Sequence, residues 1–264
     1  MFLRSLLIFL LLASSACYFK ESKINQKLDY FLQEGNRAFN EKQYDKALHL
    51  FNEGLKIVPN EPTFLSNKST VIRIRAVEKF NNSLKLTDQT LRNSNSTEAK
   101  KDLQDSVEMA NAVINQLRNQ LEIPFWGEGI ESLRRNTFFS RAESLRILAS
   151  IGEKSKADEA LSAINEYLEI EPDTAKKIKM QLSAGRMLID TFNGDLAAVE
   201  YKKILAFDEN NIEALLGVGL ALAQSNDKNK AKESKKYLQQ FINLASETHP
   251  QFSIAKEILN SSEN

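Results

Sequence analysis

The stretch LDYFLQEGNRAFNEKQYDKALHLFNEGLKIVPN, residues 28–60, decides the fold of this chain. Its apolar residues recur every three or four positions, a spacing that places them on one face of an α-helix. Gly35 and Ala47 lie twelve residues apart, and two antiparallel helices approach closely where such small residues sit at their crossing. Pro59 ends the second helix because proline has no amide hydrogen to donate. The stretch therefore predicts a helical hairpin, packed around the crossing by Phe31, Tyr44, Phe51 and Leu55.

The same glycine-to-alanine spacing returns twice near the carboxyl end. Gly185 and Ala197 are twelve residues apart, and Gly219 and Ala231 repeat the spacing one period later. Residues 28–60 resemble a tetratricopeptide repeat (TPR), a motif with a period of about 34 residues. The resemblance implies an all-α fold, a right-handed superhelical stack of antiparallel helix hairpins that forms a TPR-like α-solenoid.

The region between these repeats does not match the repeat pattern, but its apolar residues keep helical spacing. We expect a divergent long hairpin over residues 61–134, with its turn at Asn93–Glu98, where Asn95 and Glu98 are spaced like a capping box. The predicted parts of the chain are a signal peptide (1–16), a lipidated tether (17–27), the first TPR (28–60), the divergent hairpin (61–134), and TPR-like repeats with a C-terminal capping helix (135–264).

The amino-terminal residues have the features of a secretory signal: an early Arg4, an apolar run over 6–13, and small residues before Cys17. The run is shorter than the roughly 20 residues that span a bilayer. Ser14-Ser15-Ala16-Cys17 resembles the lipobox of bacterial lipoproteins, in the relaxed form typical of spirochaetes. The resemblance implies acylation of Cys17 and an exported protein anchored to a membrane by lipid, facing the periplasm or cell surface. An ordinary signal peptide with an incidental cysteine is the alternative.

Composition argues against several classes of function. Lys plus Arg and Asp plus Glu both number 35, so no global field draws the chain to nucleic acid. Cys17 is the only cysteine, and His49 and His249 are the only histidines, which removes most routes to zinc binding and to nucleophilic catalysis. We therefore predict no metal, no cofactor and no enzymatic activity.

In the TPR family, ligands usually lie in a concave groove lined by the first helix of each repeat. The resemblance therefore implies that a partner is bound by Asp29, Asn36, Phe39, Asn40, Asn67, Lys179, Arg186 and Asp190. A lysine and asparagine clamp for a peptide's terminal carboxylate is disfavoured, because Leu32 stands where the lysine is required. Trp126, the only tryptophan, is either an aromatic anchor for a partner or a plug between non-standard hairpins.

Two functions follow as hypotheses. The first is a membrane-anchored cell-envelope lipoprotein that acts as a TPR scaffold for a protein or peptide partner, in envelope assembly or in a transport complex. The alternative is a small-ligand-binding accessory protein of a transporter, with a pocket formed by the hairpin over residues 61–134. A buried apolar cavity near Trp126 would favour the alternative, whereas an open groove over a solid core favours the scaffold.

Overall fold

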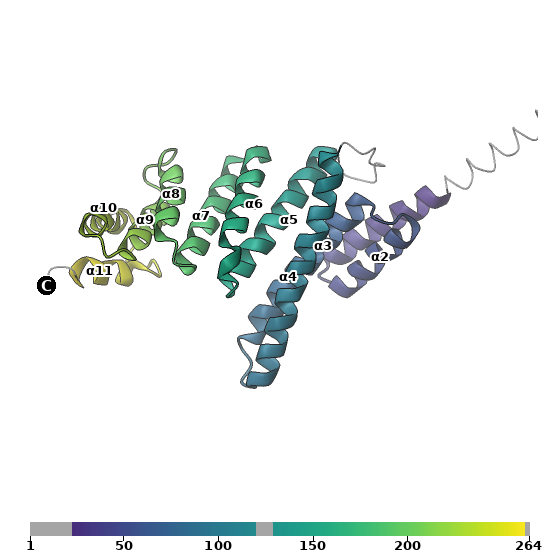
Figure 1. Cartoon of the computed structure of the whole chain (residues 1–264), viewed down its shortest axis with the longest axis horizontal. Helices are drawn as coiled ribbons and strands as arrows, with labels where there is room; N and C mark the ends of the chain where they lie inside the picture. The colour runs from purple at the N-terminus through teal and green to yellow at the C-terminus, as the bar shows by residue number, and fades with distance from the viewer. Residues whose placement is uncertain (1–22, 120–128, 262–264) are drawn as a thin grey trace, which may run out of the picture. The chain divides into compact units, whose positions relative to one another are not determined.

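The computed structural model describes residues 23–119 and 129–261 (Figure 1). Within these ranges the regular structure is entirely helical, which confirms the predicted all-α class. The chain divides into two compact units, Met1–Arg141 and Ala142–Asn264. Their boundary lies inside α5 (Ile130–Ser150), whereas the sequence placed a division at residue 134. Among the helices of the described ranges, none has the length and apolar character needed to cross a bilayer.

The first unit begins with a helix over residues 23–40, followed by α2 (Tyr44–Ile57), α3 (Pro62–Ser83) and α4 (Gln89–Arg118). The first helix therefore starts within the predicted tether, five residues before the predicted repeat. This early start has a physical reason, because Ile24 packs against the core of the hairpin. The fully buried side chains at the centre of that core include Leu28, Ala47, Phe51 and Phe64.

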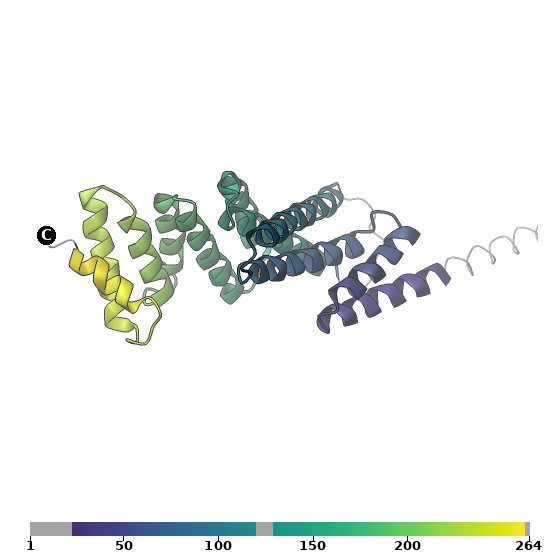
Figure 2. The same cartoon turned by 90° about the horizontal axis from the view of Figure 1, so that it is seen from below.

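The second unit contains the end of α5 and a short 3-10 helix (Lys154–Lys156). Five further helices complete it: α6 (Ala157–Ile170), α7 (Thr174–Asp190), α8 (Gly194–Leu205), α9 (Ile212–Ala223) and α10 (Lys228–Leu244). The chain ends in α11 (Phe252–Ser261), the predicted capping helix, which packs against α10 and α9 (Figure 2). Leu238, Phe241 and Phe252 are the largest buried side chains in the core that these three helices share.

The repeat glycines make room for aromatic rings. A Cβ added to Gly35 would lie 2.4 Å from the ring of Phe51, and one added to Gly185 would lie 2.5 Å from the ring of Tyr201. In both hairpins the ring follows its glycine by sixteen residues along the chain. The sequence placed small residues at the helix crossing, and the structure shows what they admit: one aromatic side chain of the second helix, laid flat against the backbone of the first.

The long middle hairpin is present, formed by α3 and α4 (Figure 1), but its predicted turn was wrong. Residues 93–98 are helical, and the turn lies at residues 84–88. Asp88 starts α4, because its carboxylate accepts a hydrogen bond from the free amide of Leu91. The Asn- and Ser-rich run follows that cap and continues the helix, with the Thr97 hydroxyl donating to the carbonyl of Asn93. Polar composition was mistaken there for a break in the helix.

Buried hydroxyls join α3 to α4 and α5 in what we call the hydroxyl seam, formed by Ser66, Ser69, Ser106, Thr137 and Ser140. The hydroxyl oxygen of Ser69 lies 3.0 Å from that of Ser106 and 2.9 Å from that of Ser140. One turn earlier, the hydroxyl oxygens of Ser66 and Thr137 are 2.8 Å apart. All five residues are buried, so small side chains allow close helix approach while their hydroxyls satisfy one another. The seam fixes the position of α5 against α3.

Candidate functional site: a carboxamide groove in the first unit

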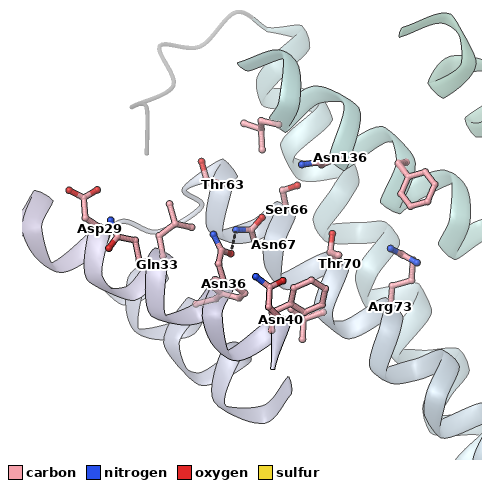
Figure 3. Close-up of a pocket in the computed structure, with 16 residues that line it drawn as sticks. Asp29, Gln33, Asn36, Asn40, Thr63, Ser66, Asn67, Thr70, Arg73 and Asn136 are labelled. Atoms are coloured by element: carbon pink, nitrogen blue, oxygen red, sulfur yellow. Dashed lines mark hydrogen bonds between the residues drawn. The ribbon is translucent and has the colours of Figure 1, made fainter. Parts of the chain in front are cut away.

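A groove of about 620 Å³ lies between the first helix, α3 and the amino-terminal part of α5 (Figure 3). All of its lining residues belong to the first unit. Its floor includes the buried side chains of Leu32, Phe51, Val71 and Leu133. Five side-chain amides stand on its walls, so we call it the carboxamide groove: Gln33, Asn36, Asn40, Asn67 and Asn136. An apolar floor between amide-bearing walls suits a ligand with both apolar and hydrogen-bonding groups.

Helical spacing explains why these side chains converge. Gln33, Asn36 and Asn40 follow one another by three and four residues, so they share one face of the first helix. On α3, Asn67, Thr70 and Arg73 are spaced by three and face the same groove. The two walls meet where the side-chain amide of Asn67 donates to the side-chain oxygen of Asn36 at 3.0 Å.

Two charged residues line the groove, and Figure 3 shows them at opposite ends of the row of amides. Asp29 is exposed on the first helix, towards its amino-terminal end. Arg73 is only 9% exposed, and its guanidinium carbon lies 5.3 Å from the centre of the Phe139 ring. That ring holds one face of the guanidinium by a cation–π interaction.

The structure brings together five of the residues predicted to bind a partner, because Asp29, Asn36, Phe39, Asn40 and Asn67 all line the groove. Their role in binding stays a prediction. Sequence reasoning missed several lining residues on the same face of the first helix, on α3 and on α5: Gln33, Thr70, Arg73, Asn136 and Phe139. The spacing by three from Asn67 could have identified Thr70 and Arg73, but only the packing of α5 against α3 reveals the last two.

The second unit has a separate charged pocket of about 400 Å³, which Arg186 and Asp190 line. Arg186 donates to Glu213 at 2.9 Å, and a ring nitrogen of His249 lies 3.2 Å from the other carboxylate oxygen of Glu213. Burial raises the pKa of Asp190, although the charges of two nearby arginines oppose the shift. Lys179, predicted with this group, is exposed on α7 and does not line the pocket.

Two predicted sites lie outside the described residues: the lipidation site at Cys17 and the candidate anchor Trp126. A search of the described residues for three or more His, Cys, Asp or Glu side chains that could hold a metal ion finds none. The buried part of the charged pocket is chiefly Tyr201, whose pKa is raised by burial. The carboxamide groove is therefore the larger of the two sites, and the one with the more varied hydrogen-bonding groups.

No family model matches the sequence, and no curated protein matches it. Among solved structures, "YrrB: a TPR protein with an unusual peptide-binding site" is similar over 86% of this chain and 89% of that chain, with 13% identity and a TM-score of 0.54. The "TPR2AB-domain:pHSP90-complex of yeast Sti1" aligns over 90% of this chain and 98% of that one, with 16% identity and a TM-score of 0.36. The first likeness, together with the helical hairpins and their glycine and aromatic pairs, shows that the chain has a TPR-like α-solenoid fold.

Proposed function

We propose that this protein is a scaffold that binds an extended segment of another protein in the carboxamide groove, and that lipid on Cys17 holds it at a cell-envelope membrane. The observation that carries the first part is the groove itself, with an apolar floor and five side-chain amides on its walls. A side-chain amide offers a donor and an acceptor of the same kind as a peptide group, so it pairs with the backbone of an extended chain whatever its sequence.

The pair formed by Asn36 and Asn67 supports this proposal energetically. In the empty groove each amide is partly satisfied by the other, at 3.0 Å, so the unbound protein carries little cost from unpaired polar groups. Binding exchanges that hydrogen bond for bonds to a peptide backbone, while the apolar floor receives alternate side chains. The net gain per hydrogen bond is modest, about 1 kcal/mol, and burial on the floor adds about 25 cal/mol per Å² of apolar surface.

The membrane part of the proposal rests on the lipobox-like sequence before Cys17. Each buried methylene of an acyl chain contributes about 0.8 kcal/mol to membrane binding, and several chains together anchor a protein stably. Six residues separate Cys17 from Lys23, where the first helix begins, and they reach at most about 20 Å when fully extended. Lipid on Cys17 would therefore keep Asp29 and the entrance of the groove within a few tens of ångströms of the membrane surface.

The proposed partner is an envelope protein of an assembly or transport complex, and nucleic acid is not expected. The alternative of a small-ligand-binding accessory protein needs an apolar cavity near Trp126, a residue outside the described ranges. The groove favours the scaffold, because its five side-chain amides suit a peptide backbone better than an apolar small molecule.

The groove is tested by mild crosslinking and co-purification of the native, membrane-extracted protein. The groove variant carries Asn36→Ala and Asn67→Ala, and the matched control carries Asn81→Ala and Asn82→Ala, two exposed residues of α3 that do not line the groove. Partners retained by the control and lost from the groove variant support the proposal. Partners retained equally by both variants rule out the carboxamide groove as their binding site.

Anchoring is tested separately with Cys17→Ser, followed by fractionation and mass spectrometry of the intact protein. We expect the wild-type protein in the membrane fraction with the added mass of acyl chains. The variant should lack that mass and leave the membrane. A wild-type protein without acyl groups would contradict the lipid anchor and leave the groove proposal standing.

A further inference from the structure

We infer that the carboxamide groove has an electrical polarity that selects its peptide by charge order, with an acidic group bound at the Arg73 end and a basic group at the Asp29 end. This inference rests on the proposed function, because it concerns the peptide that the same groove would bind. Asp29 and Arg73 are the two charged residues among those that line the groove, and they stand at opposite ends of the row of amides (Figure 3). The groove is therefore neutral in sum but charged at its ends.

The Arg73 end is built to hold an anion. A guanidinium stays charged at every relevant pH and presents its donors in a plane that matches a carboxylate. At Arg73 the Phe139 ring covers one face of that plane, at 5.3 Å, so approach is restricted to the edges that carry the donors. Arg73 is 9% exposed, and a carboxylate there would meet the cation with little water between them. Charge pairs in such surroundings are screened less than exposed pairs.

The Asp29 end is more open. Asp29 lies on the first helix, near its amino-terminal end, and its side chain is exposed. A lysine or arginine side chain of the ligand, or a free amino terminus, can approach it through water. We therefore expect a weaker and more salt-dependent contribution from this end than from Arg73.

The neutral middle of the groove makes the end charges decisive for direction. Asn36, Asn40, Asn67 and Asn136 each carry a donor and an acceptor, and a side-chain amide can turn to offer either one. Such a row binds a peptide backbone running in either direction with similar hydrogen bonding. Opposite charges at the two ends remove that equivalence, so a peptide with one acidic and one basic end binds in a single direction.

The experiment measures binding of the full-length protein to labelled peptides by fluorescence anisotropy. Three peptides share one apolar and polar core with blocked termini: a neutral peptide, one with Glu before and Lys after the core, and one with the two reversed. We expect one charged order to bind about tenfold to a hundredfold more tightly than the other, the range typical of hydrogen bonds to charged groups. The preference should shrink as salt is raised, while the affinity of the neutral peptide stays nearly constant.

Two variants connect the preference to the named residues. Arg73→Gln should bring the affinities for the two charged peptides together, but Arg73 is buried and the variant is used only if its helical content matches the wild type. Asp29→Lys changes an exposed residue, and it should make a peptide with Glu at both ends the tightest binder. Equal binding of the two charge orders, with the neutral peptide still bound, overturns the polarity and leaves the proposed function intact. Failure of every peptide to bind overturns the proposed function as well.

Discussion

The ring of Tyr201 lies between two glycines, and this arrangement supports a quantitative prediction for Gly217→Ala. A Cβ at Gly217 would lie 2.4 Å from the Tyr201 ring, and a Cβ at Gly185 would lie 2.5 Å from the same ring. Because ordinary contacts begin at 3.4 Å, the ring would have to retreat by about 1 Å from a new methyl group. Retreat from Gly217 is limited because the backbone at Gly185 is also close to the ring.

The expected magnitude follows from two opposing effects. Overpacking a tightly filled core costs about 1–3 kcal/mol, and the confinement of the Tyr201 ring favours the upper half of that range. Replacing a helical glycine by alanine returns about 1 kcal/mol of helix propensity. Gly217→Ala should therefore lower the free energy of unfolding by about 1–2 kcal/mol, although a helical glycine replaced by alanine would otherwise stabilise the protein.

The assay is urea unfolding of the full-length protein, followed by far-ultraviolet circular dichroism, with the same variant also made in a Tyr201→Leu background. The smaller leucine should relieve the clash, so Gly217→Ala should cost much less there, and the difference measures the coupling between the two positions. An unchanged or higher unfolding midpoint for Gly217→Ala alone would refute the reasoning. It would show that the ring can move aside at little cost.

Three further changes test other parts of the fold by urea unfolding. Phe192 has a φ of 65° and is 76% exposed, so Phe192→Asn should raise stability by about 1 kcal/mol, and a loss would contradict the strain. Ser69→Val should lower stability by about 1–3 kcal/mol through overpacking and the loss of hydroxyl contacts, with exposed Ser94→Val as the control. Burial raises the pKa of Glu61 above its ordinary 4.5, so its contribution to stability is present at acid pH and is lost as pH rises through the raised pKa. Glu61→Gln keeps an oxygen for the amide of Phe64 and should flatten stability between about pH 4.5 and 7; an unchanged pH profile would contradict this.

The sequence was most informative where side-chain spacing is local. Gly35 and Phe51 belong to one hairpin, so their packing follows from two adjacent helices and could be predicted. The turn of the middle hairpin was misplaced because Asn93–Glu98 has a loop-like composition, whereas the cap at Asp88 decides where α4 begins. A single strong cap outweighs a run of residues with weak helix propensity.

The candidate site shows the same limit. Asn36 and Asn67 could be identified because they match positions of the repeat, but Asn136 reaches the groove only through the packing of α5 against α3. That packing depends on buried serines and a threonine, residue types that usually indicate a solvated surface. Spacing alone does not reveal which hydroxyls pair across helices that are some 70 residues apart in the chain, as Ser69 and Ser140 do with |i−j| of 71.

The hydroxyl seam has a further consequence for the chain before it folds. Partly folded proteins aggregate through exposed apolar surface, and a helix that docks solely through leucines carries such surface until its neighbours arrive. Here α3 meets α4 and α5 partly through Ser66, Ser69 and their hydroxyl partners, which remain well hydrated while unpaired. Their hydrogen bonds form only when the helices are in register, so the seam adds specificity to docking without adding to the adhesive surface of the nascent segment.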